Sequence, residues 1–298
     1  MADLTDRVAF ARGEKPADLM LKNLKLVNVF TGEIHEAEIV IVGEYIAAVG
    51  QGYSAREVID LGGRYVCPGF IDPHVHIESA MVPPREFPKA VLPHGVTSVV
   101  ADPHEIANVL GLEGIRFMLQ DAKHGPINIY ITAPSCVPST TMETSGAQLE
   151  FYDLANLLGD PWVLGLGEVM NYPGVVAGDG RVLQKIQTYN GKVIDGHCPG
   201  LTGKGLNAYV SAGVMSDHEC TDMDEALEKL RLGMTIFIRE ATNAHNLQAL
   251  LSLAVPDLER RLCWCTDDRH PNDLLDEGSI DHIIRMAIAG GVDPVVAL

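Results

Sequence analysis

The chain has 298 residues, of which 47% are hydrophobic and 6% aromatic, and its formal net charge is −18. This length suits one large α/β domain with a small appendage, and the composition supplies a largely aliphatic core. The negative charge argues against a nucleic-acid partner, which would need clustered lysine and arginine, and no apolar run is long enough to span a membrane.

Residues 1–65 predict a small antiparallel β domain. Short β-rich runs at 24–30 and 38–42 are separated by turn signals at 31–33 and 43–44, and no helical periodicity is present. The sheet is expected to end near Gly62 and Gly63.

From residue 66 to residue 298 the pattern changes to strands that alternate with amphipathic helices. A helix is predicted over 105–123, and another over 222–232 with Gly233 as its stop. Eight such strands favour a (β/α)₈ TIM-like barrel. A doubly wound open sheet is the alternative, but it would more naturally carry a glycine-rich phosphate loop after its first strand. The strand candidates are 65–71, 96–101, 127–133, 162–166, 192–194, 213–215, 235–238 and 262–265.

Cysteine usage and the N-terminus indicate a cytoplasmic protein. The first seven residues lack the basic-then-apolar layout of a signal peptide. The six cysteines are scattered along a long chain and are expected to be reduced thiols rather than a disulfide framework. Cys263 and Cys265 alternate on a predicted buried strand, and no second cysteine pair completes a zinc site.

Two histidines, His74 and His76, follow the first predicted barrel strand. Residues i and i+2 of a strand point to the same side, so both imidazoles can reach one cation. A His-x-His pair also occurs by chance and can face solvent. Whether the pair binds metal therefore depends on finding further ligand-type residues at other strand ends.

Ligand-type side chains recur at other predicted strand ends. In a barrel, catalytic groups come from the carboxyl ends of several strands. Each residue alone has an ordinary explanation, such as a cap or a solvated loop side chain, but the ordered set predicts a metal site at one barrel mouth. Its members are His74, His76, Glu168, His197, His218 and the Asp267–Asp268 pair.

This constellation resembles the amidohydrolase superfamily, which carries His-x-His on strand one, Lys or Glu on strand four, His on strands five and six, and Asp on strand eight. Within it, the chain looks like the bacterial adenine deaminases. The phrases that carry this likeness are Pro68–Ser79, Asp102–Val109, Gly167–Asn171 and Thr266–His270. Such enzymes continue beyond the barrel with strands that complete the small domain, so the resemblance implies a chain truncated after the barrel, with an incomplete β domain.

The resemblance implies a binuclear site and hydrolytic deamination of adenine to hypoxanthine and ammonia. Glu168 would bridge two divalent ions, with His74, His76 and Asp267 at one and His197 and His218 at the other. Manganese is favoured, with iron or zinc as alternatives. A metal-bound hydroxide would attack C6 of adenine, while Asp267 moves a proton and Glu219 protonates the ring.

Several points stay open at this stage. Asp268 can be the ligand instead of Asp267, and Glu219 can have a supporting structural role. Asp102 and Asp268 are candidates for binding the substrate, with His104, Arg269 and His270 as further reachable polar groups. The expected partner is a small purine, and a homo-oligomer is expected. The alternatives are an amidohydrolase that cleaves a cyclic amide or N-acyl bond, and a truncated chain without catalysis.

Overall fold

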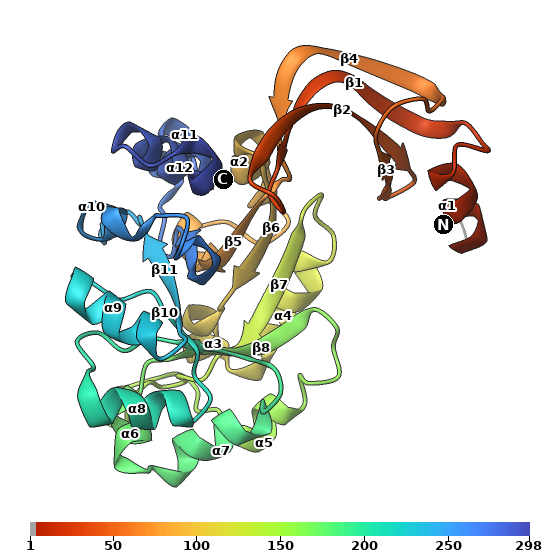
Figure 1. Ribbon diagram of the computed structural model, residues 1–298. Helices are drawn as coiled ribbons and strands as arrows, with labels where there is room; N and C mark the ends of the chain where they lie inside the picture. Colours follow the sequence, from red (N-terminus) through yellow and green to blue (C-terminus); the bar gives the residue numbers. More distant parts are fainter. Residues whose placement is uncertain (1–3) are drawn as a thin grey trace. The chain divides into compact units, whose positions relative to one another are not determined.

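The computed structural model describes residues 4–298, which form two compact units that divide after Pro68. The smaller unit begins with a short helix and continues as a four-stranded sheet with the order β3-β2-β1-β4 (Figure 1). Its elements are α1 (Leu4–Ala11), β1 (Ala17–Asn28), β2 (Glu33–Val42), β3 (Tyr45–Val49) and β4 (Ala55–Val66).

The small sheet is mixed, so the prediction of a wholly antiparallel sheet was wrong for one strand pair. β2 runs antiparallel to β1 and to β3, but β4 runs parallel to β1. The chain crosses from β3 to the far edge of β1 instead of turning back as a hairpin, and a crossover produces parallel pairing. β4 also continues through Gly62 and Gly63, whose φ angles are +61° and +77°, at a shift in the β1–β4 register. These glycines mark an irregularity in the strand and not its end.

The larger unit, Gly69–Ala297, contains eight strands in chain order. β5 to β9 form one parallel sheet and β10 to β12 form a second one. The strands are β5 (Phe70–Val75), β6 (Val96–Ala101), β7 (Asn128–Ala133), β8 (Val163–Val169), β9 (Val193–Gly196), β10 (Ser216–Asp217), β11 (Thr235–Arg239) and β12 (Leu262–Cys265).

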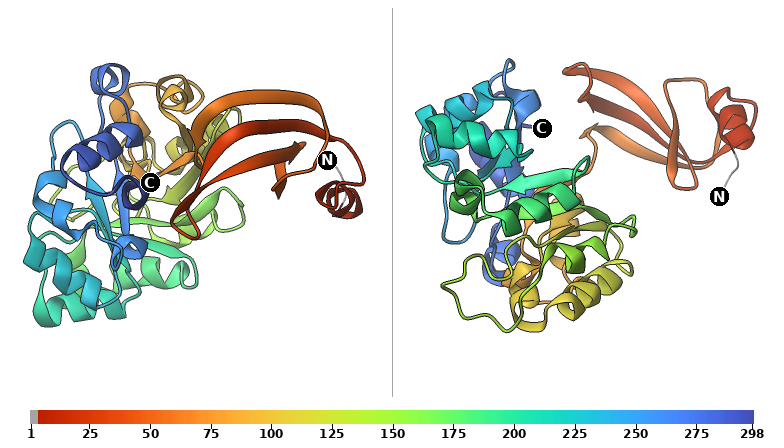
Figure 2. Two further views of the ribbon diagram at one scale, coloured as in Figure 1. Left: turned by 45° about the horizontal axis from the view of Figure 1, so that its top comes forward. Right: turned by 90° about the horizontal axis from the view of Figure 1, so that it is seen from below.

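The two parallel sheets meet at the first and last strands of this unit. A parallel bridge joins Val75 to Asp267, and the backbone of Asp267 bonds to both His74 and His76. Asp72, buried in β5, accepts bonds from the backbone and hydroxyl of Thr266 beyond β12. The unit is therefore an α/β fold with curled parallel sheets, seen in two further views in Figure 2.

Helices connect the strands, with α4 beside β7 and α9 and α10 beside β11 (Figure 1). The α-helices are α2 (Pro88–Val91), α3 (His104–Leu110), α4 (Leu112–Ala122), α5 (Phe151–Ala155), α6 (Tyr172–Ala177), α7 (Gly180–Thr188), α8 (Gly203–Ser211), α9 (Met223–Arg231), α10 (Leu247–Leu250), α11 (Pro271–Asp276), α12 (Ile280–Ala289) and α13 (Pro294–Ala297). The 3₁₀ turns are η1 (Ile77–Ala80), η2 (Leu92–His94), η3 (Leu251–Leu253) and η4 (Glu259–Arg261).

Several predicted boundaries differ from the structure. The first predicted barrel strand, 65–71, is wrong: it joins the last residues of β4 to the first residues of β5, and residues 67–69 between them belong to no strand. The helix predicted over 105–123 is two helices, because Gly111 adopts φ +61° between α3 and α4. The sixth strand of the larger unit is Ser216–Asp217 instead of the predicted 213–215. The helix over 222–232 is confirmed as α9, where the Asp222 side chain accepts a bond from the Glu225 amide.

The core of the larger unit lies between strands and helices. Ile129 and Ile131 on β7 and Leu166 on β8 are all fully buried. Strands covered on both faces are apolar along most of their length, so polar side chains occur mainly where the strands end. Within residues 4–298 there is no helix long and apolar enough to cross a membrane, and all six cysteines are free thiols.

Candidate metal centre

The six predicted metal ligands lie together at the carboxyl ends of the parallel strands. His74 lies in β5 and His76 directly follows it, Glu168 lies near the end of β8, and the other three follow β9, β10 and β12. All are buried except His197, whose side chain is 24% exposed. Each residue comes from a separate strand end apart from the His-x-His pair, so the fold and not local sequence brings them together.

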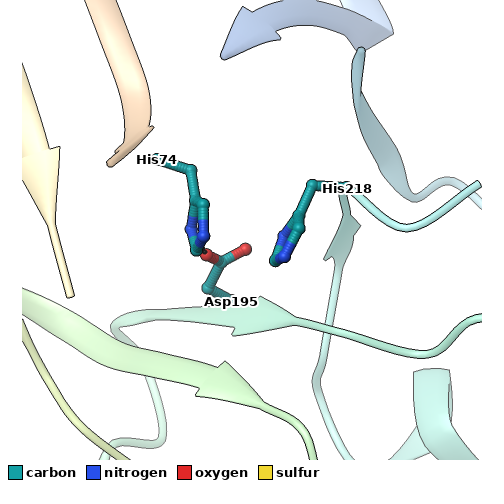
Figure 3. Close-up of side chains that lie close together, drawn as sticks. All are labelled: His74, Asp195 and His218. Atoms are coloured by element: carbon teal, nitrogen blue, oxygen red, sulfur yellow. Dashed lines mark hydrogen bonds and ion pairs between the residues drawn. The ribbon is translucent and has the colours of Figure 1, made fainter. Parts of the chain in front are cut away.

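The outward-facing nitrogens of the histidine pair have partners that fix the ring orientation. Nδ1 of His74 donates to Oδ2 of Asp195 at 2.7 Å, and Figure 3 shows this carboxylate beside the His74 ring, with the ring of His218 facing it. Nδ1 of His76 donates to the backbone oxygen of Asp102 at 2.9 Å. Partners of this kind are typical of histidines that bind metal through the other nitrogen.

The spacing of the two Nε2 atoms of the histidine pair shows whether a metal ion fits between them. Nε2 of His74 lies 3.1 Å from Nε2 of His76. Because each Nδ1 carries the ring proton, neutral rings would point two lone pairs at each other. Ligand atoms about 2.1 Å from a shared ion lie roughly 3 to 3.5 Å apart in a tetrahedral arrangement, so the spacing suits a bound cation.

Two carboxylates face the same point as the histidine pair. Nε2 of His76 lies 3.0 Å from Oδ1 of Asp267 and 3.3 Å from Oε1 of Glu168. Nitrogen and oxygen donors together suit a divalent ion such as zinc, iron or manganese. The first ligand group therefore consists of four side chains: His74, His76, Glu168 and Asp267.

The second oxygen of Glu168 faces two more histidines. Oε2 of Glu168 lies 2.5 Å from Nδ1 of His197 and 3.3 Å from Nε2 of His218. Nδ1 of His218 is buried without a hydrogen-bond partner in the described part of the chain. These three side chains form the second ligand group, and Glu168 belongs to both groups through different oxygens.

The pKa shifts within the cluster indicate a demand for positive charge. Burial disfavours ionisation of Glu168, but the surrounding histidines outweigh it and hold the pKa of Glu168 well below its usual range. The pKa of Asp267 is likewise held well below its usual range, against burial, by His74 and His76. Two buried anionic carboxylates need compensating positive charge. Against burial, the neighbouring acids raise the pKa values of His74 and His76 well above the usual range, so protonated histidines supply this charge without a metal, and a divalent ion would supply it when the histidines are neutral ligands.

Asp267 is held in a backbone conformation that few side chains adopt. Its φ is +54°, and its N–H donates to the backbone oxygen of His74 at 3.0 Å. Such conformations cost energy and cluster at functional sites. Oδ1 faces the histidines and Oδ2 accepts a bond from Nη1 of Arg239 at 2.7 Å. Asp268 is exposed and accepts a bond from the hydroxyl of Ser79, but it also belongs to a candidate metal group with His76 and Asp267, so Asp267 as the ligand stays a prediction.

Glu219 and Arg239 lie beside the second ligand group. Oε1 of Glu219 lies 3.5 Å from Nε2 of His218. Arg239 binds both oxygens of Glu219, with Nη2 donating to Oε2 at 3.2 Å, and also binds Asp267. One guanidinium therefore holds the two carboxylates that were predicted to move protons.

The predicted substrate-binding residues occupy different positions. Oδ2 of Asp102 accepts the backbone N–H of Glu168 at 2.9 Å, close against Gly167, where a Cβ would lie 2.2 Å from Oδ2 of Asp102. Asp102 therefore helps to fix the backbone of Glu168, whereas the side chain of Asp268 is exposed to solvent. Substrate binding by either residue stays a prediction. Arg269 binds two other groups, with Nη1 donating to the backbone oxygen of Glu240 at 2.9 Å and Nη2 to the carboxylate of Glu277.

Sequence reasoning missed Asp195 and Arg239 and gave His104 no definite role. Nδ1 of His104 lies 3.3 Å from Oε1 of Glu168. Burial lowers the pKa of His104, but the neighbouring Asp102 carboxylate outweighs this effect and raises the pKa to about 9. The signal for Asp195 was a carboxylate two residues before His197 on a short apolar strand. The signal for Arg239 was a charged residue directly after the apolar run of strand seven.

Comparison with known families matches residues 65–284 to the Amidohydrolase family. The chain belongs to the amidohydrolase family. Among curated relatives, it is 50% identical to the adenine deaminase of Kosmotoga olearia and 51% identical to that of Thermosipho africanus. These alignments cover 99% and 98% of this chain and 52% of each relative. The chain thus spans about half the length of the curated relatives it matches.

Solved structures show the same fold at low sequence identity. A D-hydantoinase from Thermus sp. matches with a TM-score of 0.67 and 16% identity, over 94% of this chain and 79% of that one. N-acetyl-D-glucosamine-6-phosphate deacetylase from Mycobacterium smegmatis matches with a TM-score of 0.64 and 17% identity, over 94% and 86%. At this identity the likeness establishes the fold of this amidohydrolase and not its substrate.

Proposed function

We propose that this amidohydrolase deaminates adenine hydrolytically, giving hypoxanthine and ammonia. The observation that carries the proposal is the paired ligand cluster in which Glu168 offers one oxygen to His76 and the other to His197 and His218. About 50% identity across almost the whole chain to proteins named adenine deaminase supports adenine as the substrate.

We infer that the eight parallel strands form one (β/α)₈ barrel over residues 66–298, preceded by a separate β domain over residues 1–65. The chain-order arrangement of the strands supports this, as do the Val75–Asp267 bridge and the bonds between Asp72 and Thr266. At the other junction, the N–H of Gly196 donates to the hydroxyl of Ser216 at 3.2 Å.

The centre would be binuclear, with manganese as the favoured metal. His74, His76 and Asp267 would hold the first ion, His197 and His218 the second, and Glu168 would bind both. When bound, divalent ions would supply the Lewis acidity that activates water for attack on C6 of adenine.

Asp267 and Glu219 would carry the protons of the reaction. Asp267 would accept one proton from the attacking water and pass it to the leaving amine. Glu219 would protonate the ring nitrogen next to C6 and regain a proton from the new C6 hydroxyl as that group becomes the carbonyl of hypoxanthine. Arg239 would keep both carboxylates on the same side of the ligand cluster, because it binds each of them. Asp102 and Asp268 are the proposed substrate contacts.

A substrate panel tests the proposal. The manganese-loaded chain is expected to release ammonia from adenine and to form hypoxanthine in equal amounts. The same protein is assayed with a cyclic amide and an N-acylated amino acid, whose hydrolysis yields a carboxylate and no ammonia from a ring amine. Carboxylate production from either compound, with no ammonia from adenine, would place the chain with another reaction of its family.

A further inference from the structure

A buried ion pair lies directly behind the second ligand group. Lys229 on α9 and Asp217 on β10 are both fully buried, and Nζ of Lys229 donates to Oδ2 of Asp217 at 2.9 Å. The same ammonium donates to Oε1 of Glu225 at 2.6 Å and to the backbone oxygen of Cys198 at 2.8 Å. All three protons of the ammonium thus have acceptors.

Besides Lys229 and the thiol of Cys220, Asp217 binds backbone groups next to both histidines. Its Oδ1 accepts the N–H of Cys198 at 2.8 Å, and its Oδ2 accepts the N–H of Glu219 at 3.2 Å. Cys198 directly follows His197, and Asp217 directly precedes His218. The ion pair therefore fixes the chain beside each of the two histidines, which come from different strand ends.

The cost of burying two charges indicates a role beyond stability. Replacing a buried ion pair by apolar residues is often neutral or stabilising, because desolvation offsets the attraction between the charges. A network that satisfies every donor and holds two loops in register is suited to positioning their side chains. We propose that Lys229 and Asp217 are positioning residues that hold His197 and His218 at the spacing that the second metal ion needs.

The effect should be specific to the second ion, because the first ligand group has other supports. His74 is oriented by the Asp195 carboxylate and His76 by the backbone oxygen of Asp102, and neither contact involves α9. The inference rests on the proposed binuclear centre. Its test therefore includes the unaltered chain.

The experiment measures metal binding and not activity. The metal-free chain is titrated with Mn²⁺ by equilibrium dialysis, and bound metal per chain is counted by mass spectrometry. The unaltered chain is expected to bind two ions. Lys229→Met is expected to retain the first ion and to bind the second about tenfold to a hundredfold more weakly.

A matched control and a second variant separate positioning from loss of folding. Lys123→Met breaks the 2.7 Å ion pair with Asp160, which precedes β8 at its amino end, and should leave both ions bound with unchanged affinity. Asp217→Asn keeps the side-chain shape and the Lys229–Glu225 pair, and it carries the test if thermal melting shows that Lys229→Met does not fold.

The outcomes distinguish the inference from the centre on which it rests. Selective weakening of the second ion in either folded variant supports the inference. Two ions bound with unaltered affinity in both variants would overturn it and leave the metal centre intact. Fewer than two ions in the unaltered chain would overturn the binuclear centre, and with it the role assigned to Lys229.

Discussion

Asp195 shows how one side chain prepares another for metal binding. Its Oδ2 accepts Nδ1–H of His74, while its Oδ1 accepts bonds from the hydroxyl of Ser216 at 2.6 Å and from the N–H of Gly196 at 2.9 Å. These bonds fix the carboxylate, which in turn fixes the His74 ring and keeps the proton on Nδ1. Nε2 is thereby left as the metal-binding atom.

Substitution of Asp195 by Asn should weaken metal binding. The neutral amide is a poorer acceptor for Nδ1–H of His74, so we expect the affinity for the first ion to fall about tenfold to a hundredfold. Dialysis against Mn²⁺ at graded concentrations measures the change. Asp281→Asn is the matched control. Asp281 also pairs with a histidine that is distant in sequence, His94 at 3.1 Å, but neither residue is a proposed metal ligand. Equal affinities in the two variants would remove the role given to Asp195.

At the residue scale, the sequence predicted the residues that could bind metal but not those that orient them. His74, His76, Glu168, His197, His218 and Asp267 are chemically distinctive and stand at strand ends, and the structure brings all of them together. Asp195 and Arg239 act through other side chains. Their partners are far away in sequence, so the local signals at these two positions do not show which side chains they contact.

At the element scale, α8 ties two strand ends together through one hydroxyl. The hydroxyl of Tyr209 on α8 donates to the backbone oxygen of Val169 at 2.8 Å and accepts the N–H of His197 at 3.0 Å. Val169 directly follows Glu168. The side chain is fully buried, so this link joins the backbone near two proposed ligands without contact with water.

Tyr209→Phe should therefore affect both stability and metal binding. Loss of the hydroxyl leaves a buried N–H and a buried carbonyl without this partner, which should lower the free energy of unfolding by about 1 to 3 kcal/mol. Tyr189→Phe is the control, because the equally buried hydroxyl of Tyr189 donates only to the backbone oxygen of Leu154 at 2.8 Å. Urea unfolding should show a loss in both variants, whereas only Tyr209→Phe should weaken Mn²⁺ binding. Unchanged binding in both would show that α8 has no part in the centre.

The order of strands and helices could be predicted because short apolar runs indicate strands and amphipathic stretches between them indicate helices. The strands at 96–101 and 262–265 were predicted with the same bounds that the structure has. The break at Gly111 and the parallel pairing of β4 with β1 were missed. Gly111 was a local helix-stop signal that the prediction did not use. The choice of sheet edge depends on tertiary contacts, which the hydrophobic pattern does not encode.

At the scale of the whole molecule, metal binding should be linked to stability. A ligand that binds only the folded chain stabilises it by about 2.7 kcal/mol when its free concentration is a hundredfold above Kd. The thermal midpoint of unfolding should therefore rise with Mn²⁺ concentration and fall after chelation. Scanning calorimetry measures this, and the double substitution His74→Ala and His76→Ala should reduce the dependence. A midpoint that is the same with and without metal would contradict a divalent site in the core of the fold.

Titration of the metal-free chain with Mn²⁺, with bound metal and ammonia release from adenine followed in the same samples, tests the central claim most directly. We predict that ammonia release is absent without metal, rises with occupancy and reaches its plateau at two ions per chain. Asp267→Asn should release far less ammonia at the same occupancy. A folded chain that binds two ions and releases no ammonia from adenine would contradict the proposed function.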